Sequence, residues 1–125
     1  MSDQFRALIV DDDREMRQSL VVLLERSGWQ VEAVGGAQLA LSKLELTAPD
    51  VVLSDVRMPG MTGLDLLDEM TKRPSPPLVL ISAHGDIPMA VDAIQKGAYT
   101  FLEKPFEPRR LLTAMRHAAE KHRLS

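Results

Sequence analysis

The 125-residue sequence predicts an α/β domain in which helices cover both faces of a doubly wound, five-stranded parallel sheet. Five short apolar runs recur, and each is followed by a stretch with the periodicity of an amphipathic helix. Three runs, 7–10, 51–53 and 78–81, are apolar throughout, as expected of parallel strands buried on both faces. The second run, 31–34, contains a charge and suits an edge, so with right-handed crossovers we expect the strand order 2-1-3-4-5.

The elements follow one another as strand and helix along the whole chain. The expected strands are 7–10, 31–34, 51–53, 78–81 and 99–102. Apolar positions at helical spacing mark four of the helices. The first helix has Met16, Leu20, Leu23 and Leu24, and the second has Ala37, Ala40, Leu41 and Leu44. The third has Leu64, Leu67 and Met70, and the last has Leu111, Leu112, Met115 and Ala119. Gly28 is expected to end the first helix, Pro49 lies beyond the second, and Gly97 is placed to cap the fourth, 87–96.

Composition is that of a single folded domain spanning residues 1–125. Hydrophobic residues make up 45% of the chain and charged residues 26%, which argues against disorder. The absence of cysteine excludes disulfides and thiol catalysis and suits a cytoplasmic protein. The net charge of -3 gives no reason to expect direct nucleic-acid binding, and no signal peptide or membrane span is present.

Carboxylates gather where the first and third strands end. In an open α/β sheet the binding crevice lies at the carboxyl ends of the strands where their order reverses, here between these two strands. Asp11, Asp12 and Asp13 leave the first strand, and Asp55 ends the third. Such carboxylates repel one another unless a cation lies among them, and an all-oxygen set without His or Cys favours Mg²⁺. The D-x-D-x-D-G loop of an EF-hand calcium site is absent.

Helix capping is the alternative role for these aspartates. Asp13 precedes the helix that starts near Arg14 and is a plausible N-cap. One cap accounts for one aspartate, and leaves Asp11, Asp12 and Asp55 unexplained.

Two more strand ends contribute a hydroxyl group and a cation. Ser82 follows the fourth strand, and Lys104 followed by Pro105 leaves the fifth. Singly, Ser82 would be a small residue bonded to backbone and Lys104 a solvated cation. Together in the crevice they would supply a donor and a positive charge for a phosphoryl group. A cis peptide bond before Pro105 is a further expectation.

Four segments together resemble bacterial two-component receiver domains, which have a flavodoxin-like fold. They are V-D-D-D (10–13), S-D-V-R-M-P-G-M-T-G (54–63), I-S-A-H-G-D (81–86) and E-K-P-F (103–106). The resemblance covers essentially the whole chain in order and spacing. The segment 84–91 is most similar to receivers of C4-dicarboxylate-transport and nitrogen-fixation regulators, and the former type, which precedes a sigma-54-activating ATPase, is the better match.

The resemblance implies a phosphoacceptor and a Mg²⁺ site. Asp55 would take a phosphoryl group from a phosphohistidine of a sensor histidine kinase. Asp12 would bind Mg²⁺ directly, Asp11 mainly through water, and the backbone carbonyl of Arg57 would complete the ligands with Asp55. The chain would catalyse its own phosphorylation and dephosphorylation, and is not expected to be an enzyme acting on an external substrate.

Other family positions imply a switch. Ser82 resembles the hydroxyl residue that moves toward the phosphoryl group, and Lys104 the lysine that pairs with it. Phe101 lies where the family has an aromatic switch residue. Arg57 and His84 occupy positions that tune hydrolysis of the acyl phosphate, and we expect these bulky side chains to lengthen its life.

The resemblance also implies an output. The expected output surface is 86–121, and homodimerisation is expected through it or through the last helix. That helix, about 108–124, is expected to run into a linker to an output domain in cis; a stand-alone receiver or the receiver of a LuxR-type DNA-binding regulator is the alternative. Its basic residues are interpreted as a solvated face rather than a DNA contact: Arg109, Arg110, Arg116, Lys121 and Arg123.

Three other functions are possible on this fold, and each requires a sequence feature that can be checked. A phosphatase or phosphotransferase with an aspartyl nucleophile typically has a second acid two residues later, where this chain has Arg57. A flavodoxin-like cofactor binder needs a hydroxyl- and glycine-rich loop after the first strand. A degenerate receiver that serves only as an interaction module would lack part of the site. Met58, Met61 and Met89 are expected either to form an adaptable interaction surface or to pack loops.

Overall fold

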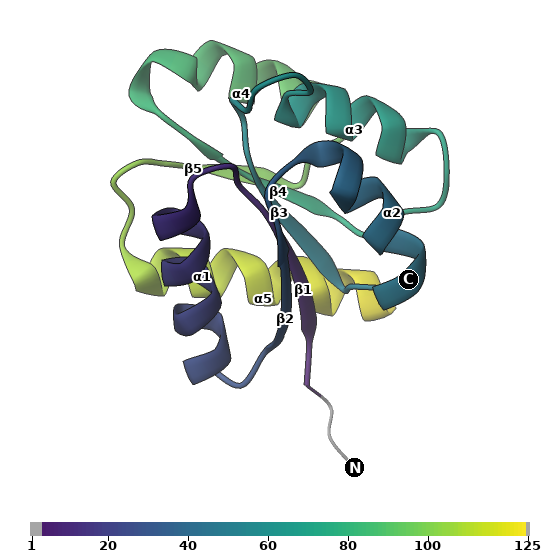
Figure 1. Cartoon of the computed structure of the whole chain (residues 1–125), viewed down its shortest axis with the longest axis vertical. Helices are drawn as coiled ribbons and strands as arrows, with labels where there is room; N and C mark the ends of the chain where they lie inside the picture. Colours follow the sequence, from purple (N-terminus) through teal and green to yellow (C-terminus); the bar gives the residue numbers. More distant parts are fainter. Residues whose placement is uncertain (1–3, 125) are drawn as a thin grey trace.

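A computed structural model describes residues 4–124, and it contains one five-stranded parallel sheet between two layers of helices (Figure 1). The strand order is β2-β1-β3-β4-β5, as predicted. In chain order the elements are β1 (Arg6–Val10), α1 (Arg14–Arg26), β2 (Gln30–Val34), α2 (Ala37–Thr47), β3 (Val51–Asp55), α3 (Gly63–Thr71), β4 (Leu78–Ser82), α4 (Ile87–Gln95), β5 (Thr100–Glu103) and α5 (Pro108–Leu124). A short 3₁₀ turn, His84–Asp86, leads into α4.

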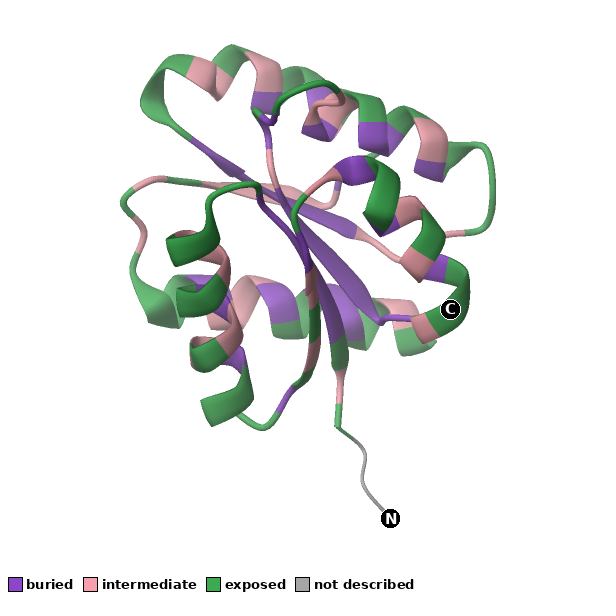
Figure 2. Cartoon of the chain, viewed as in Figure 1, coloured by how far each residue is buried: buried purple, intermediate pink, exposed green. Residues whose placement is uncertain are grey.

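Two hydrophobic cores lie on opposite faces of the sheet, and the three central strands β1, β3 and β4 are almost wholly buried between them (Figure 2). Alternate residues of one strand enter different cores, because successive strand side chains point to opposite faces. In β1, Leu8 packs with α2, α3 and α4, whereas Ile9 packs with α1 and α5. Continuous apolarity in the sequence therefore reflected burial on both faces. Within residues 4–124, no helix combines the length and apolarity that crossing a membrane requires.

The helix ends follow the expected chemistry. The Asp13 carboxylate accepts hydrogen bonds from the backbone N–H groups of Glu15 and Met16, which confirms it as the N-cap of α1. Gly28 and Gly97 follow helix ends with φ of 90° and 120°, where glycine avoids the penalty of a side chain. The fifth strand was predicted one residue too early, since β5 ends with Glu103 opposite Ser82.

An ion pair fastens the last turn of α5 to the amino-terminal edge of the sheet. Arg123 Nε and Nη2 donate to the two carboxylate oxygens of the buried Asp50 at 3.0 and 2.9 Å, and the guanidinium lies over the Phe5 ring. Asp50 also accepts the backbone N–H of Arg6 at 2.8 Å. Arg123 is exposed, as expected of the solvated basic face, but it also makes this ion pair, whereas Arg116 of the same helix is simply exposed.

Removal of this ion pair is expected to destabilise the domain. We expect Asp50→Ala to lower the free energy of unfolding by about 1–3 kcal/mol, because it leaves the Arg123 guanidinium and the Arg6 N–H without their shared charged acceptor. Arg116→Gln serves as the exposed control, with a change within about 0.5 kcal/mol. Urea denaturation measures both, and equal midpoints would contradict the assigned role.

The same pair predicts a dependence on pH. Burial alone would raise the pKa of Asp50, but hydrogen bonds from Arg123 and from the Arg6 backbone outweigh it and hold the pKa below its usual range. The stabilisation is therefore present above the unfolded-state pKa of about 4 and lost as pH falls through the lower folded-state value. Acid titration of stability should show this loss in the wild type and not in Asp50→Ala.

Candidate functional site

Three carboxylates converge at the carboxyl ends of β1 and β3. The strands are adjacent and in register, with Val10 opposite Ser54, so the residues that follow them meet. Asp11, Asp12 and Asp55 each offer a carboxylate oxygen, and these atoms all lie within 4.8 Å of one another. Asp11 is buried, the Asp55 side chain is only 12% exposed and Asp12 is exposed, which leaves the cluster open on one side. The predicted acidic crevice is therefore present in the fold.

Asp11 carries the clearest sign that the cluster suits a cation. Its Oδ1 accepts the Asp13 backbone N–H at 2.9 Å, but its buried Oδ2 has no hydrogen-bond partner within residues 4–124. Burial raises the pKa of Asp11 and the charges of Asp55 and Asp12 raise it further; the hydrogen bond from Asp13 and the Lys104 charge only partly oppose this. An unpartnered anionic oxygen among like charges is costly, and a hard cation would remove that cost.

Lys104 reaches the same crevice from β5. Its Nζ lies 3.0 Å from Asp55 Oδ2, while the backbone N–H of Arg57 donates to Asp55 Oδ1 at 3.2 Å. The carboxylate of Asp55 is thus held at both oxygens. The Lys104–Pro105 peptide bond is cis, as expected from the sequence.

Ser82 and Phe101 lie on neighbouring strands beside the carboxylates. Ser82 is fully buried at the end of β4, and its hydroxyl donates to the carbonyl oxygen of Ala83 at 2.9 Å rather than to a carboxylate. The half-buried ring of Phe101 on β5 packs against the core beneath α2, α3 and α4. Neither residue is hydrogen-bonded to the three carboxylates within residues 4–124.

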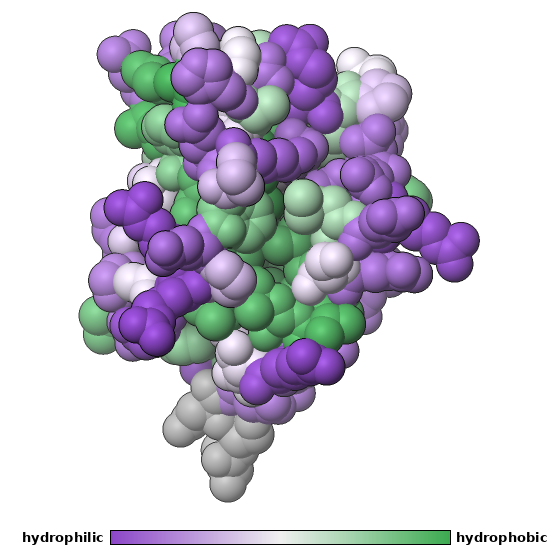
Figure 3. Space-filling view, turned by 90° about the vertical axis from the view of Figure 1, so that its left-hand side faces the viewer, coloured by the Kyte–Doolittle hydropathy of each residue, from purple (hydrophilic) through white to green (hydrophobic). Residues whose placement is uncertain are grey.

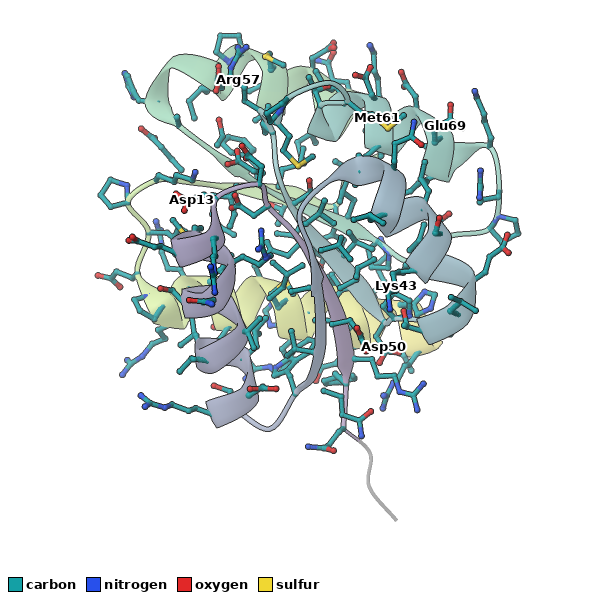
Figure 4. All side chains as sticks on the ribbon, in the orientation of Figure 1. Asp13, Lys43, Asp50, Arg57, Met61 and Glu69 are labelled. Carbon is teal, nitrogen blue, oxygen red and sulfur yellow. The ribbon has the colours of Figure 1, made fainter. Side chains whose placement is uncertain are left out.

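The two bulky residues that flank the crevice are each paired with an acid. Arg57 forms an ion pair with Asp86 at 2.8 Å, and His84 Nδ1 lies 2.7 Å from Glu103 Oε2. Figure 4 shows Arg57 beside the start of α4, at the same end of the sheet as Asp13 and opposite to Asp50. Both side chains are largely exposed.

The three methionines pack against the hydrophobic core to different extents. Met58 is buried in the core, and Met61 and Met89 lie partly buried against it. Packing accounts for Met58, which is not available as surface, whereas an interaction surface formed by Met61 and Met89 stays a prediction.

Two residues that support the site were not singled out from the sequence. Gly63 opens α3 directly behind Asp55, and its N–H donates to the Val56 carbonyl oxygen at 2.8 Å. Arg17 Nη1 donates to the backbone carbonyl of Asp11 at 2.8 Å and so holds the β1–α1 loop. Gly63 follows a turn-rich segment, which was a usable signal. Nothing in the helical pattern distinguished Arg17 from a surface arginine.

The fold and crevice define a flavodoxin-like α/β domain with an acidic, lysine-bordered pocket at its topological switch point. Residues 7–116 match the family described as the response regulator receiver domain, and the chain belongs to that family. The resemblance noted in the sequence is thereby confirmed.

Curated relatives include the receivers expected from the 84–91 segment. The chain is 44% identical over 125 residues to the C4-dicarboxylate transport transcriptional regulatory protein DctD of Rhizobium meliloti, covering 99% of this chain and 27% of DctD. It is 44% identical over 120 residues to the transcriptional regulatory protein FixJ of Bradyrhizobium diazoefficiens, covering 95% of this chain and 58% of FixJ. The chain therefore spans only part of these regulators.

Solved structures agree in fold. A response regulator receiver domain protein from Clostridium thermocellum superposes with a TM-score of 0.90 at 28% identity, covering 96% of this chain and 98% of the other. NtrX from Brucella abortus superposes with a TM-score of 0.89 at 37% identity, covering 97% of this chain and 28% of NtrX.

Proposed function

We propose that the chain is a phosphorylation-activated receiver in which Asp55 accepts a phosphoryl group from a sensor histidine kinase. One carboxylate oxygen of Asp55 would form a bond to phosphorus as the bond to the imidazole nitrogen breaks. The imidazole leaves with that electron pair. The observation that carries the proposal is the convergence of the Asp11, Asp12 and Asp55 carboxylates, with Lys104 Nζ 3.0 Å from Asp55. Phosphoryl transfer depends mainly on alignment and charge stabilisation.

The donor set fits Mg²⁺ as the cofactor. Asp12 and Asp55 would hold the ion with the backbone carbonyl of Arg57, and Asp11 would act mainly through a bound water. When bound, Mg²⁺ would neutralise charge that develops on the phosphoryl oxygens. Lys104 would pair with the phosphoryl group from the other side. The unpartnered Oδ2 of Asp11 supports this assignment.

Incubation with Mg²⁺ and acetyl phosphate, followed by intact-mass measurement, tests the proposal. The wild type is expected to gain one phosphoryl group and Asp55→Asn none, because the amide cannot act as the nucleophile. Asp68→Asn makes the same change at an exposed position of α3 and should behave as the wild type. Phosphoryl incorporation that persists in Asp55→Asn would overturn the site.

Ser82 and Phe101 are proposed as the switch. The Ser82 hydroxyl would leave the Ala83 carbonyl for a phosphoryl oxygen, and the Phe101 ring would rotate inward as Ser82 moves. Because Phe101 has no phenolic hydroxyl, packing alone would report the two states. A Ser82→Ala chain that is phosphorylated and shifts its α4 amide resonances as the wild type does would contradict this role.

Arg57 and His84 are proposed to shield the acyl phosphate from water. We expect Arg57→Ala and His84→Ala each to speed phosphate loss by about fivefold, equivalent to roughly 1 kcal/mol in the barrier. The decay of the phosphorylated mass after removal of the phosphodonor measures this. Arg116→Gln, distant on α5, is the control, and unchanged decay in both site variants would remove the shielding role.

The output is proposed to be transcriptional. DctD and FixJ are both transcriptional regulatory proteins, and the better match of the 84–91 segment favours a sigma-54-dependent regulator of the dicarboxylate-transport type. A LuxR-type regulator or a stand-alone receiver is the alternative. We place the protein in the cytoplasm, with residues 1–125 as the receiver, α5 leading to an output domain in cis, and no direct nucleic-acid contact by this domain.

Homodimerisation is proposed through α4, β5 and α5, or through α5 alone. A groove of about 1150 Å³ runs beside the edge strand β5, lined by Phe101, Arg110 and His117 among others. The side of the molecule in Figure 3 has hydrophobic residues across its middle, with hydrophilic residues around them. Light scattering with and without beryllofluoride tests the proposal, and one protomer mass in both states would contradict it.

A further inference from the structure

Two loops at the rim of the crevice are joined by a single ion pair. Arg57 lies in the loop after β3, and Asp86 ends the 3₁₀ turn that leads into α4. Arg57 Nη2 donates to Asp86 Oδ1 at 2.8 Å, and Nε lies 3.3 Å from each carboxylate oxygen. Nη2 also lies 3.5 Å from the Met89 sulfur, in the first turn of α4. One guanidinium therefore ties the phosphoacceptor loop to the beginning of α4.

Asp86 lies at the N-cap position of α4, but its side chain does not cap the helix. It is the N-cap residue of α4, yet its side chain accepts no hydrogen bond from the first turn. In α1 and α3 the N-cap residues Asp13 and Thr62 do accept such bonds. Pro88 follows within the first turn and has no N–H, so Met89 is the position that a capping carboxylate at 86 would serve. The Asp86 carboxylate thus has two alternative partners, the Arg57 guanidinium and the first turn of α4.

A phosphoryl group on Asp55 would compete for the same guanidinium. Arg57 is two residues from Asp55, and its backbone N–H already donates to Asp55 Oδ1 at 3.2 Å. A phosphoryl group carries more negative charge than a carboxylate and presents several acceptor oxygens, which arginine can bind in bidentate fashion. The Arg57 side chain is 65% exposed, so its pairing with Asp86 is weak enough to be exchanged.

We propose that the Arg57–Asp86 ion pair is a latch that holds the start of α4 against the β3–α3 loop, and that phosphorylation of Asp55 opens it. Arg57 exchanges Asp86 for the phosphoryl group, and the released Asp86 carboxylate caps the first turn of α4. This inference rests on the proposed function of Asp55, and adds a route from the phosphorylated residue to α4 that does not pass through Ser82 or Phe101.

Substitutions at Asp86 separate the two roles of its carboxylate. Asparagine removes the charge that pairs with Arg57 but still caps helices, whereas alanine removes both functions. The latch opposes the phosphorylated conformation, so its loss should favour binding of a phosphoryl mimic. With Mg²⁺ and beryllofluoride, we expect Asp86→Asn to bind about three- to fivefold more tightly than the wild type. Asp86→Ala should show a smaller increase in beryllofluoride affinity, because the first turn of α4 then lacks its cap in the open state.

The decisive comparison repeats Asp86→Asn in an Arg57→Ala background. Without the guanidinium there is no latch to open, so the second substitution should change beryllofluoride affinity by less than about twofold. Amide resonances of α4, such as those of Ala90 and Ala93, report the titration. Glu69→Gln removes partly exposed ion pairs with Lys72 and Arg73 at the end of α3. It is the matched charge control, expected to bind beryllofluoride as the wild type does.

The outcomes distinguish the latch from the function on which it rests. The latch is overturned, and the receiver function stands, if the wild type gains phosphoryl mass but Asp86→Asn binds beryllofluoride no more tightly. The same holds if Asp86→Asn raises beryllofluoride affinity equally with and without Arg57. If the wild type neither gains mass at Asp55 nor binds beryllofluoride, both are overturned. Thermal denaturation of each variant excludes misfolding as the cause.

Discussion

Replacement of Gly63 with alanine is expected to lower the free energy of unfolding by about 3 kcal/mol, at the upper end of overpacking costs. A Cβ at this position would lie 2.7 Å from the backbone oxygen of Asp55, 3.1 Å from Val56 Cα and 3.0 Å from Leu80 Cδ2. Two of these atoms belong to the backbone that leaves β3 and cannot rotate away. The contact between the added Cβ and this backbone would also displace Asp55, so phosphorylation should become slower as the protein becomes less stable.

Urea denaturation and acetyl-phosphate labelling measure the two consequences of Gly63→Ala. Gly85→Ala is the matched control, because a Cβ there meets nothing within 4 Å and its φ is not positive. We expect that control to stay within about 0.5 kcal/mol of the wild type with an unchanged denaturant slope. Equal midpoints for the two variants would show that the approach of α3 to Asp55 is not close in solution.

The strand order was predictable because burial leaves a strong trace in the sequence. Strands covered on both faces have no polar position, so 51–53 and 78–81 could be placed in the middle of the sheet. Glu32 interrupts the second run and marks the edge, where β2 lies. Once strands alternate with helices, the handedness of crossovers leaves few topologies.

The meeting of Asp11, Asp12 and Asp55 was predictable for the same reason. Parallel strands that neighbour each other end at one edge of the sheet, so residues that directly follow them must lie close together. Lys104 belongs to the same pattern, since it directly follows β5. The geometry of the site thus depends on backbone topology, which apolar patterning encodes.

Interactions between side chains of distant segments were not predictable in this way. Arg123 pairs with Asp50 across 73 residues, and Arg57 pairs with Asp86 across 29. Each charge taken alone has the pattern of a solvated residue, and only the folded chain brings its partner near. The direction of the Asp86 side chain is a similar case, because it precedes α4 without capping it and pairs with Arg57 instead.

Asp11 and Asp12 are expected to support the stabilisation of the protein by Mg²⁺, and Asp11 is expected to destabilise the protein when Mg²⁺ is absent. In wild-type protein, Mg²⁺ at ten times its dissociation constant should raise the free energy of unfolding by about 1.4 kcal/mol. Asp12→Asn should abolish that gain, because Asp12 is proposed to bind the ion directly. Asp11→Asn should remove most of it, since loss of a residue that acts through a bound water lowers metal affinity by roughly 10- to 100-fold. In EDTA, Asp11→Asn should be more stable than the wild type, because it removes a buried carboxylate with an unpartnered oxygen.

Asp13→Asn is the matched control for these variants. It makes the same charge change one residue further along, where the side chain caps α1 and offers no ligand atom to the cluster. Asparagine caps as well as aspartate, so both the stability in EDTA and the gain with Mg²⁺ should be retained. A control that loses the Mg²⁺ response would show that net charge near α1, rather than the three converging carboxylates, governs cation binding.

The pH dependence of the Mg²⁺ effect follows from Asp11. Its pKa is raised chiefly by burial, so protons compete with the cation at a higher pH than at an ordinary aspartate. Since the charged form is the disfavoured one, acidification through this raised pKa relieves the cost in EDTA while it weakens Mg²⁺ binding. Stability measured with and without Mg²⁺ should therefore converge as pH falls. In Asp11→Asn most of the difference between the two curves should be lost at every pH, and a difference as large as that of the wild type would assign the cation to other residues.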